Sequence, residues 1–446
     1  MDLPYRLGKY ELDKQIGMGA TSKVYHGVDT FNDQEVAVKM IEPSVLNDPE
    51  FTESCRKQFL SEASLAGKLS HPHVVSILEA SVSEQSGYVV MEYVPGGNLV
   101  PHSYHDNLLP IRDVLQIIYK CCSALEYAFN LGIIHRDIKP GNIMVVSGTN
   151  VKITDFGAAI FMRDHHDHTV TSGTLSYMSM EHIRGHSLTY LSDMYSLGVV
   201  TYELLTGRLP FEADTQEGLI DAIANKAVAS PRELRSEITP ELEKIVLKMM
   251  ARSAEDRYPT WKVLAAEIAA LAKKQFADTA PVQKTEEAEA ESVPDENRPS
   301  EISDIEKFRI MLSLHALKGF SDPEIWELVQ VSKWSWIPEK SIVLREDETA
   351  TSMYILASGA LRVTKQGSLL NVIKQGEFFG DMAYVLKGSN RMATLETMTD
   401  SIVIEFGFDV LENLTSSCGM QFVKSLLRSM TGRLAAADNR IVRMHG

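Results

Sequence analysis

The chain has 446 residues, 44% of them apolar, and a formal net charge of −16, which allows two or three domains with separate cores. With this charge and no basic cluster, nucleic acid is excluded as an expected partner, and without a run of about eighteen apolar residues or a signal-peptide core we expect neither a membrane span nor export. The four cysteines lack the paired spacing of metal ligands and are expected to be reduced core residues of a cytoplasmic protein.

The first predicted elements are two strands joined by a glycine-rich turn over residues 16–24, Ile-Gly-Met-Gly-Ala-Thr-Ser-Lys-Val. Glycines let backbone N–H groups approach phosphate oxygens because no Cβ lies in the way. Such turns are also common between strands, so this run is weak by itself. A strand at 36–39 ends on Lys39, and an apolar helical period follows from about 51 to 69, with Glu62 inside it.

The most informative pattern is the pair of segments 135–142, His-Arg-Asp-Ile-Lys-Pro-Gly-Asn, and 155–157, Asp-Phe-Gly. Phosphoryl transfer to a hydroxyl group needs two carboxylates and an amide in this order. Asp137 can orient the attacking hydroxyl, while Asn142 and Asp155 can hold magnesium against the phosphates. At these residues the chain resembles the protein kinase family.

The resemblance implies ATP and Mg²⁺ as cofactors and proteins as substrates. In the family, a lysine at the place of Lys39 grips the α- and β-phosphates and pairs with a glutamate, here Glu62. Ser22 stands where the family pattern has a third glycine. The adenine edge is expected to hydrogen-bond the backbone between Glu92 and Val94. The residues expected to bind ATP are Ile16, Gly17, Gly19, Ser22, Val24, Ala37, Lys39, Glu92, Val94 and Met144.

Lys139 is the serine/threonine signature of the family and would neutralise charge on the transferring phosphoryl group. Magnesium is expected at Asn142 and Asp155. Relatives that select arginine before the acceptor use glutamates where this chain has Asn98 and Gly141, which argues against a strongly arginine-directed enzyme. The residues expected to take part in catalysis are Asp137, Lys139, Lys39, Glu62, Asn142, Asp155 and Thr174.

An irregular polar stretch lies at 163–172. Phosphorylation of Thr169 or Thr171 would order it through pairing with Arg136. The alternative is an unmodified solvated loop. Its three histidines could suggest a metal site, but an exposed run without cysteines favours the solvated loop.

Two further ionic features are expected in the same half of the chain. Glu181, which follows this stretch, has Arg257 as its expected ion-pair partner. Asp193 resembles the aspartate that braces the backbone of the catalytic loop in the family. The ion pair would hold the substrate loop onto the helical lobe.

The segment 277–302 is rich in Glu, Ala, Pro and Ser and nearly free of large apolar residues. Such a segment cannot bury enough surface to fold, so we expect an extended acidic linker. It separates a kinase domain at 9–276, whose last helix is predicted at 258–276, from a second domain at 303–442.

The second domain begins with a helical pattern and then changes to short strands of period two, such as 341–344, with glycines between them. This indicates a compact antiparallel roll or barrel. At 376–383, Gly-Glu-Phe-Phe-Gly-Asp-Met-Ala, and at 391–394, Arg-Met-Ala-Thr, it resembles the cyclic-nucleotide-binding domain family. The predicted fold class is therefore α+β and multidomain: a bilobal protein kinase fold followed by a β-roll with flanking helices.

In that second family, a short helix presents N–H groups to a cyclic phosphate, an arginine, here Arg391, makes charge-assisted bonds, and a glutamate accepts from the ribose hydroxyl. Asp381 replaces this glutamate and Asn390 replaces a proline; if Asp381 cannot reach, the loss is roughly 1–3 kcal/mol. Met392 stands where guanine-preferring relatives carry threonine or serine, which favours cAMP over cGMP. The residues expected to bind the cyclic nucleotide are Gly380, Asp381, Met382, Arg391, Met392 and Thr394.

The last predicted element is a helix with an apolar seam. The seam consists of Phe422, Leu426, Leu427, Met430 and Leu434. Such a helix covers the nucleotide, packs against a second subunit in a homodimer, or docks on its own domain. Together the patterns predict a serine/threonine kinase regulated by a cyclic nucleotide. Two alternatives remain: a constitutive kinase whose roll is a non-binding dimerisation or scaffold module, and a scaffold or sensor with a vestigial kinase.

Overall fold

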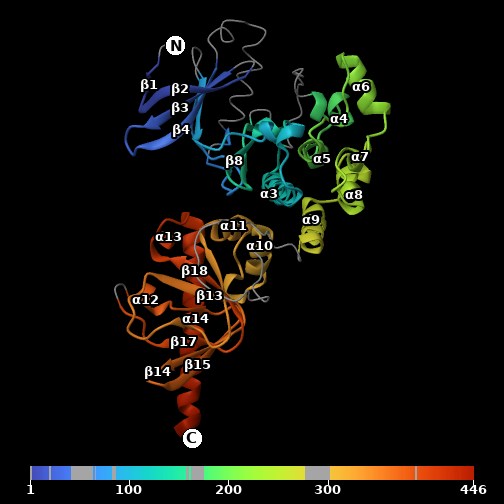
Figure 1. The fold of residues 1–446 in the computed structure, drawn as a ribbon. Helices are drawn as coiled ribbons and strands as arrows, with labels where there is room; N and C mark the ends of the chain where they lie inside the picture. Colours follow the sequence, from blue (N-terminus) through green and yellow to red (C-terminus); the bar gives the residue numbers. More distant parts are fainter. Residues whose placement is uncertain are drawn as a thin grey trace, which may run out of the picture. The chain divides into compact units, whose positions relative to one another are not determined.

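The computed structural model describes residues 3–19, 22–41, 64–65, 67–82, 87–156, 160–161, 175–276, 302–386 and 389–445. The chain divides into two compact units, Met1–Ala277 and Asp278–Gly446, which are coloured along the sequence in Figure 1. Most of the predicted linker, residues 277–301, lies outside the described residues.

The first unit begins with a six-stranded antiparallel sheet in the order β1-β2-β3-β4-β6-β5 (Figure 1). Its strands are β1 (Tyr5–Leu7), β2 (Tyr10–Met18), β3 (Ser22–Asp29), β4 (Gln34–Ile41), β5 (Ile77–Val82) and β6 (Gly87–Glu92). Alternation along β4 sends Val36 and Val38 into one apolar cluster and Ala37 into another, as a period of two requires. The two faces of the sheet are therefore both covered.

The rest of the first unit is mainly helical. Its α-helices are α3 (Ile111–Asn130), α4 (Met180–Ile183), α5 (Tyr190–Thr206), α6 (Gln216–Asn225), α7 (Pro231–Leu234), α8 (Pro240–Met249) and α9 (Trp261–Phe276). Nearly every residue of α5 is buried, so this helix forms the centre on which α3, α7 and α8 pack. Thr189 caps its start, accepting from Leu191 N at 3.2 Å, and Gly207 at φ 72° ends it.

Short elements between α3 and α4 carry the catalytic segments. They are β7 (Ile133–Ile134), the 3₁₀ turn η3 (Pro140–Asn142), β8 (Ile143–Ser147), β9 (Asn150–Ile153), β10 (Ile160–Phe161) and the 3₁₀ turn η5 (Leu175–Tyr177). The hairpin β8–β9 pairs Ile143 with Ile153. This pairing brings the residues just before β8 close to those just after β9, although the two segments are separated along the sequence.

Two predicted helix boundaries in the first unit were wrong. The helix expected to reach about residue 69 ends at Ser64 within the described residues, because Gly67 adopts φ +70° and the chain turns away. The helix expected from residue 258 begins at Trp261. Thr260 accepts there from Val263 N at 3.2 Å, so the helix and its side-chain cap begin three residues later than the apolar pattern suggested.

The second unit contains two four-stranded antiparallel sheets, in the orders β11-β18-β13-β16 and β12-β17-β14-β15. Their strands are β11 (Lys333–Ile337), β12 (Ile342–Leu344), β13 (Ser352–Ser358), β14 (Ala360–Lys365), β15 (Ser368–Lys374), β16 (Phe378–Phe379), β17 (Thr394–Thr397) and β18 (Ser401–Gly407). One apolar cluster takes residues from both sheets, among them Leu356 and Leu395. The two sheets therefore close around one core, which confirms the predicted roll.

Helices lie before and after the strands of the roll, and one short helix, α12, lies between β16 and β17. They are α10 (Asp304–Ser313), the 3₁₀ turn η7 (His315–Leu317), α11 (Asp322–Val331), α12 (Met382–Val385), α13 (Phe408–Glu412) and α14 (Ser416–His445). Ser303 with Glu306, and Ser321 with Glu324, form capping boxes at α10 and α11. No helix in the described part of the chain is both long and apolar enough to cross a membrane.

Candidate functional site

A cavity of about 360 Å³ lies in the first unit, bounded by the glycine-rich turn, the end of β6 and the catalytic segments. Every residue expected to bind ATP lines it, together with Lys139, Asn142 and Asp155 from the catalytic set. The cavity also has lining residues that the sequence reasoning missed: Val75, Met91, Tyr93 and Thr154. Met91 directly precedes Glu92, and Thr154 directly precedes Asp155. Their position next to predicted site residues was the signal that could have identified them.

The glycine-rich turn closes tightly over this cavity. Gly19 N donates to the carbonyl oxygen of Ser22 at 2.8 Å, and Ser22 is buried although it replaces a glycine. A Cβ at Gly17 would lie 3.3 Å from the Cβ of Val24, which is tighter than ordinary contact. Small residues in the turn therefore keep the backbone close to the space that phosphates would occupy.

At the end of β6, the side chain of Glu92 is bound by other residues of the first unit, so this segment offers its backbone groups to the cavity. The Glu92 carboxylate accepts from Lys152 Nζ at 2.7 and 2.8 Å and from Ser76 N at 2.7 Å. A Cβ at Gly96 would lie 2.3 Å from Val145 O, so the glycine is required where the segment after Val94 passes β8. These contacts fix the strand end in one position.

Lys39 lies at the back of the cavity and is buried. Its Nζ is 2.5 Å from Oδ1 of Asp155. Burial alone would raise the pKa of Asp155, but the charge and hydrogen bond of Lys39 outweigh it and hold that pKa below its ordinary value. Glu62, the expected partner of Lys39, lies outside the described residues. Within those residues, the lysine is held by the second carboxylate of the motif pair.

Asp137 has two unequal carboxylate oxygens. Oδ2 accepts from Lys139 Nζ at 2.7 Å and from Asn142 Nδ2 at 2.9 Å. Oδ1 is buried and has no hydrogen-bond partner among the described residues. One oxygen is thus fixed by the chain, and the other can accept a hydrogen bond from a hydroxyl group.

Magnesium fits the donor set at the same place. Asn142 Nδ2 donates to the carbonyl and carboxylate oxygens of Asp137, which leaves its own amide oxygen as a ligand atom. Asp155 adds a carboxylate, and both residues line the cavity. Oxygen ligands of this kind suit Mg²⁺, which keeps several waters or phosphate oxygens for its other positions.

Asp193 holds the backbone that carries Asp137. Its Oδ2 accepts from His135 N and its Oδ1 from Arg136 N, both at 2.8 Å. Arg136 adopts φ +71°, a conformation that costs energy for a non-glycine residue and persists where neighbours enforce it. Burial raises the pKa of Asp193, against the effect of His135 and Arg136. The expected bracing contact is confirmed.

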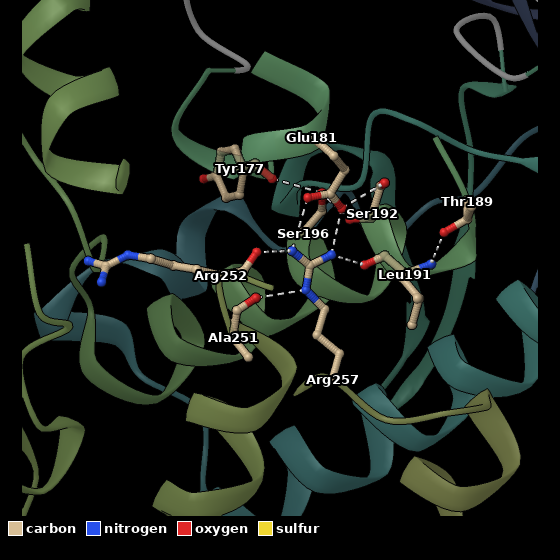
Figure 2. Close-up of polar contacts among 9 residues, drawn as sticks. All are labelled: Tyr177, Glu181, Thr189, Leu191, Ser192, Ser196, Ala251, Arg252 and Arg257. Atoms are coloured by element: carbon tan, nitrogen blue, oxygen red, sulfur yellow. Dashed lines mark hydrogen bonds and ion pairs between the residues drawn. The ribbon is translucent and has the colours of Figure 1, made fainter. Parts of the chain in front are cut away.

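The predicted ion pair between Glu181 and Arg257 is also confirmed (Figure 2). Arg257 Nη1 donates to Glu181 Oε1 at 2.6 Å and Nη2 to Oε2 at 3.1 Å. The Arg257 side chain is fully buried, and it also donates to the carbonyl oxygens of Leu191, Ala251 and Arg252. Burial alone would raise the pKa of Glu181, but Arg257 holds it below its ordinary value. Thr174, Thr169 and Thr171 lie outside the described residues.

In the second unit, the expected cyclic-nucleotide residues lie around the start of α12. Gly380 adopts φ +68°, and a Cβ there would lie 2.8 Å from Arg391 Nη1. Arg391 is buried; Nη1 donates to Gly380 O at 3.0 Å and Nη2 to Ser352 O at 2.8 Å. Burial lowers the pKa of this guanidinium below its ordinary value. Met382 and Met392 are exposed.

The remaining two residues of this set have protein partners. Thr394 Oγ1 accepts from Glu346 N at 3.0 Å. Asp381 is buried and forms an ion pair with Arg433 of α14. Sequence reasoning missed Arg433, because no local pattern connects it with Asp381.

The comparisons with known proteins match a different family model to each of the two units. A family model described as protein kinase domain matches residues 10–268, and one described as cyclic nucleotide-binding domain matches residues 335–418. Among curated proteins, the chain is 35% identical over 272 residues to the serine/threonine-protein kinase PknB of Mycobacterium leprae, covering 59% of this chain and 43% of the relative.

Two further relatives are similar. Identity is 34% over 300 residues to the probable serine/threonine-protein kinase PknB of Corynebacterium glutamicum, covering 65% of this chain and 45% of the relative. It is 34% over 264 residues to the serine/threonine-protein kinase PrkC of Bacillus subtilis, covering 58% and 40%. The chain thus spans less than half the length of these relatives.

Proposed function

Because the chain belongs to the protein kinase family, we propose that it is a serine/threonine kinase that transfers the γ-phosphate of ATP to Ser or Thr hydroxyl groups of proteins. The observation that carries this proposal is the carboxylate of Asp137, with Oδ2 fixed by Lys139 and Asn142 and Oδ1 without a partner among the described residues. Oδ1 would accept the hydrogen of the attacking hydroxyl.

The other residues would act by position and charge. Lys139, held 2.7 Å from Asp137, would offset charge on the transferring group. Lys39 would contact the phosphates at the back of the cavity. Asn142 and Asp155 would hold Mg²⁺, which neutralises charge on the phosphates when bound. The apolar wall of Val24, Ala37 and Met144 would enclose the adenine, and phosphorylated Thr169 or Thr171 would pair with Arg136.

The test is a kinase assay on the full chain with labelled ATP and a generic protein acceptor. Asp137→Asn is expected to lower kcat about 10²- to 10⁴-fold, since it removes the acceptor of the hydroxyl proton. The rise in melting temperature on adding Mg²⁺-ATP should persist. Asp106→Asn, at an exposed aspartate, is the control and should leave both quantities unchanged. A full rate in the Asp137→Asn variant would overturn the role proposed for Asp137, whereas no phosphorylation by the unsubstituted chain would support the vestigial-kinase alternative.

The second unit supports a finer proposal, regulation by a cyclic nucleotide, with cAMP favoured. The match to the cyclic nucleotide-binding domain and the buried Arg391 beside Gly380 support it. The nucleotide would bind more tightly to one conformation of the unit and so shift the population of active kinase. If cAMP and cGMP change neither the melting temperature nor the phosphorylation rate, the non-binding alternative stands.

The homodimer also remains a proposal, and α14 supplies its support. The predicted seam divides into two faces: Phe422 and Leu426 are buried on their own unit, while Leu427 and Leu434 are exposed. Exposed Met420 and Val423 extend the second face at spacings of three, four and seven residues. That repeat is typical of helices that pair in a coiled coil.

A cytoplasmic location completes the proposal. Cys121, Cys122 and Cys418 are buried free thiols, as expected for reduced core residues, and Cys55 lies outside the described residues. Buried thiols of this kind suit a reducing compartment.

A further inference from the structure

Arg391 in the second unit is a buried cation, 6% exposed, and none of the ion pairs among the described residues includes it. Its Nη1 and Nη2 atoms donate to the backbone carbonyl oxygens of Gly380 and Ser352. Carbonyl oxygens satisfy donors but carry no net charge. The guanidinium therefore keeps its positive charge for an anion.

Two carboxylates are close enough to act on this charge. Burial lowers the pKa of Arg391, and Tyr354, Glu348 and Glu405 oppose that shift. Glu348 is held by another group, because its Oε2 accepts from Arg345 N at 3.3 Å. A direct ion pair of Glu405 with Arg391 would neutralise the charge that binds a phosphate. An open anion site therefore requires that Glu405 and Arg391 stay apart.

Tyr354 contacts both of these groups. Its ring centroid is 5.7 Å from Arg391 Cζ, within the range of a cation–π interaction. Its hydroxyl accepts from Ser352 Oγ at 2.9 Å and donates to Glu405 Oε1 at 3.4 Å. Tyr354 on β13 pairs directly with Glu405 on β18, and such partners share one face of a sheet. One tyrosine thus contacts the guanidinium with its ring and the carboxylate with its hydroxyl.

The ring of Tyr354 is fixed by its other neighbours. It stacks on Phe379, its partner on β16, with centroids 5.1 Å apart and an interplanar angle of 11°. A Cβ at Gly380 would lie 3.3 Å from Tyr354 Cδ2, so the backbone passes close to the ring edge. Because the ring cannot turn without disturbing β16, its hydroxyl stays directed at Glu405.

We propose that Tyr354 is a positioning residue of the cyclic-phosphate site: its hydroxyl retains Glu405, so that Arg391 stays available to the phosphate of a nucleoside 3′,5′-cyclic monophosphate. This rests on the proposed binding of a cyclic nucleotide to the second unit. Without the hydroxyl, the half-buried carboxylate of Glu405 loses a donor and turns to the nearest cation. Carboxylate and phosphate then compete for one guanidinium, and the apparent affinity falls by the fraction of molecules in which Arg391 is free.

The experiment is a calorimetric titration of the full chain with cAMP and, separately, with cGMP. Tyr354→Phe keeps the ring and removes the hydroxyl, and it should bind at least tenfold more weakly than the unsubstituted chain. Adding Glu405→Gln to Tyr354→Phe removes the competing charge and should restore the affinity to within threefold. Adding Glu339→Gln instead, at an exposed glutamate of the same unit, is the matched control and should leave the affinity low.

The outcomes separate this inference from the function beneath it. If the unsubstituted chain binds a cyclic nucleotide and Tyr354→Phe binds it equally well, the hydroxyl has no positioning role and the inference alone is overturned. Weak binding that Glu405→Gln does not restore would also overturn it, since loss of packing, unlike loss of charge separation, is not repaired by removing a carboxylate. If the unsubstituted chain binds neither nucleotide at millimolar concentration, the proposed ligand and the inference are both overturned, and the kinase proposal is untouched.

Discussion

At the scale of single residues, the first unit depends on charged groups that are buried but paired. Asp193 and Arg257 are buried and Glu181 is half-buried, and each has two or more hydrogen-bonded partners. Buried charges are tolerated only under that condition. Their effect is to fix loops rather than to add stability in general.

The pair of Glu181 and Arg257 gives the sharpest stability prediction. Arg257→Met should lower the free energy of unfolding by about 3–5 kcal/mol, because it removes a fully buried guanidinium and leaves the half-buried carboxylate of Glu181 without its cation. Chemical denaturation measures this loss. Lys274→Met breaks the exposed pair with Glu241 and serves as the control, for which no measurable change is expected. Equal effects of the two substitutions would contradict the importance of burial.

Glu203 gives a prediction on pH. Burial, more than any other cause, raises its pKa to about 7, although the hydroxyl of Tyr177 donates to it at 2.7 Å. A raised pKa means that the folded chain binds the proton more tightly than the unfolded chain, so this group lowers stability as the pH rises from about 4.5 to 7.

Glu203→Gln removes that titration. Relative to the unsubstituted chain, the variant should gain up to about 3 kcal/mol of unfolding free energy between pH 4.5 and pH 7. Denaturation curves at several pH values measure the difference. A constant difference across that range would show that Glu203 titrates normally.

At the scale of elements, α14 has two apolar faces, one buried and one exposed. Phe422 and Leu426 pack on the roll, whereas Leu427 and Leu434 are 56% and 64% exposed. Large apolar side chains that line up on an exposed helix face typically bind another surface. The element therefore links the folding of one unit to the proposed association of two chains.

Leu427→Glu tests this association. If two α14 helices pair, a carboxylate in the seam should convert the dimer to a monomer or raise its dissociation constant at least tenfold, as light scattering after size exclusion can measure. Leu369→Glu, at an exposed position on β15, is the control and should leave the mass unchanged. A monomer in the unsubstituted chain at high micromolar concentration would rule out the dimer.

At the scale of the whole molecule, the chain consists of two units with separate cores. The cavity proposed to bind ATP is lined entirely from the first unit, and the cluster of Arg391, Asp381 and Arg433 lies entirely in the second. Units with independent cores unfold as independent cooperative blocks unless their interface is large.

Calorimetry of the full chain should therefore show two transitions. Mg²⁺-ATP at 100 times its dissociation constant should stabilise only one of them, by about 2.7 kcal/mol, and a cyclic nucleotide at the same ratio should stabilise the other. A single transition that both ligands raise together would mean that the two units unfold as one.

The candidate active site was largely readable from the sequence. Asp137, Asn142 and Asp155 are carried by two short segments joined by one hairpin, so their spacing along the chain already implies their proximity. Alternation along residues 36–39 likewise fixed which side of β4 carries Lys39. Helix ends were predicted less well, since Gly67 and the cap at Thr260 act through local backbone geometry that an apolar period does not record.

The partner of Asp381 was decided by tertiary structure alone. Arg433 lies 52 residues further along the chain, and its side chain reaches the carboxylate only because packing of Phe422 sets the rotation of α14 about its axis. The same rotation buries Leu426 and exposes Leu427. A sequence specifies which residues a helix can present, whereas the contacts of a completed core determine which of them face inward.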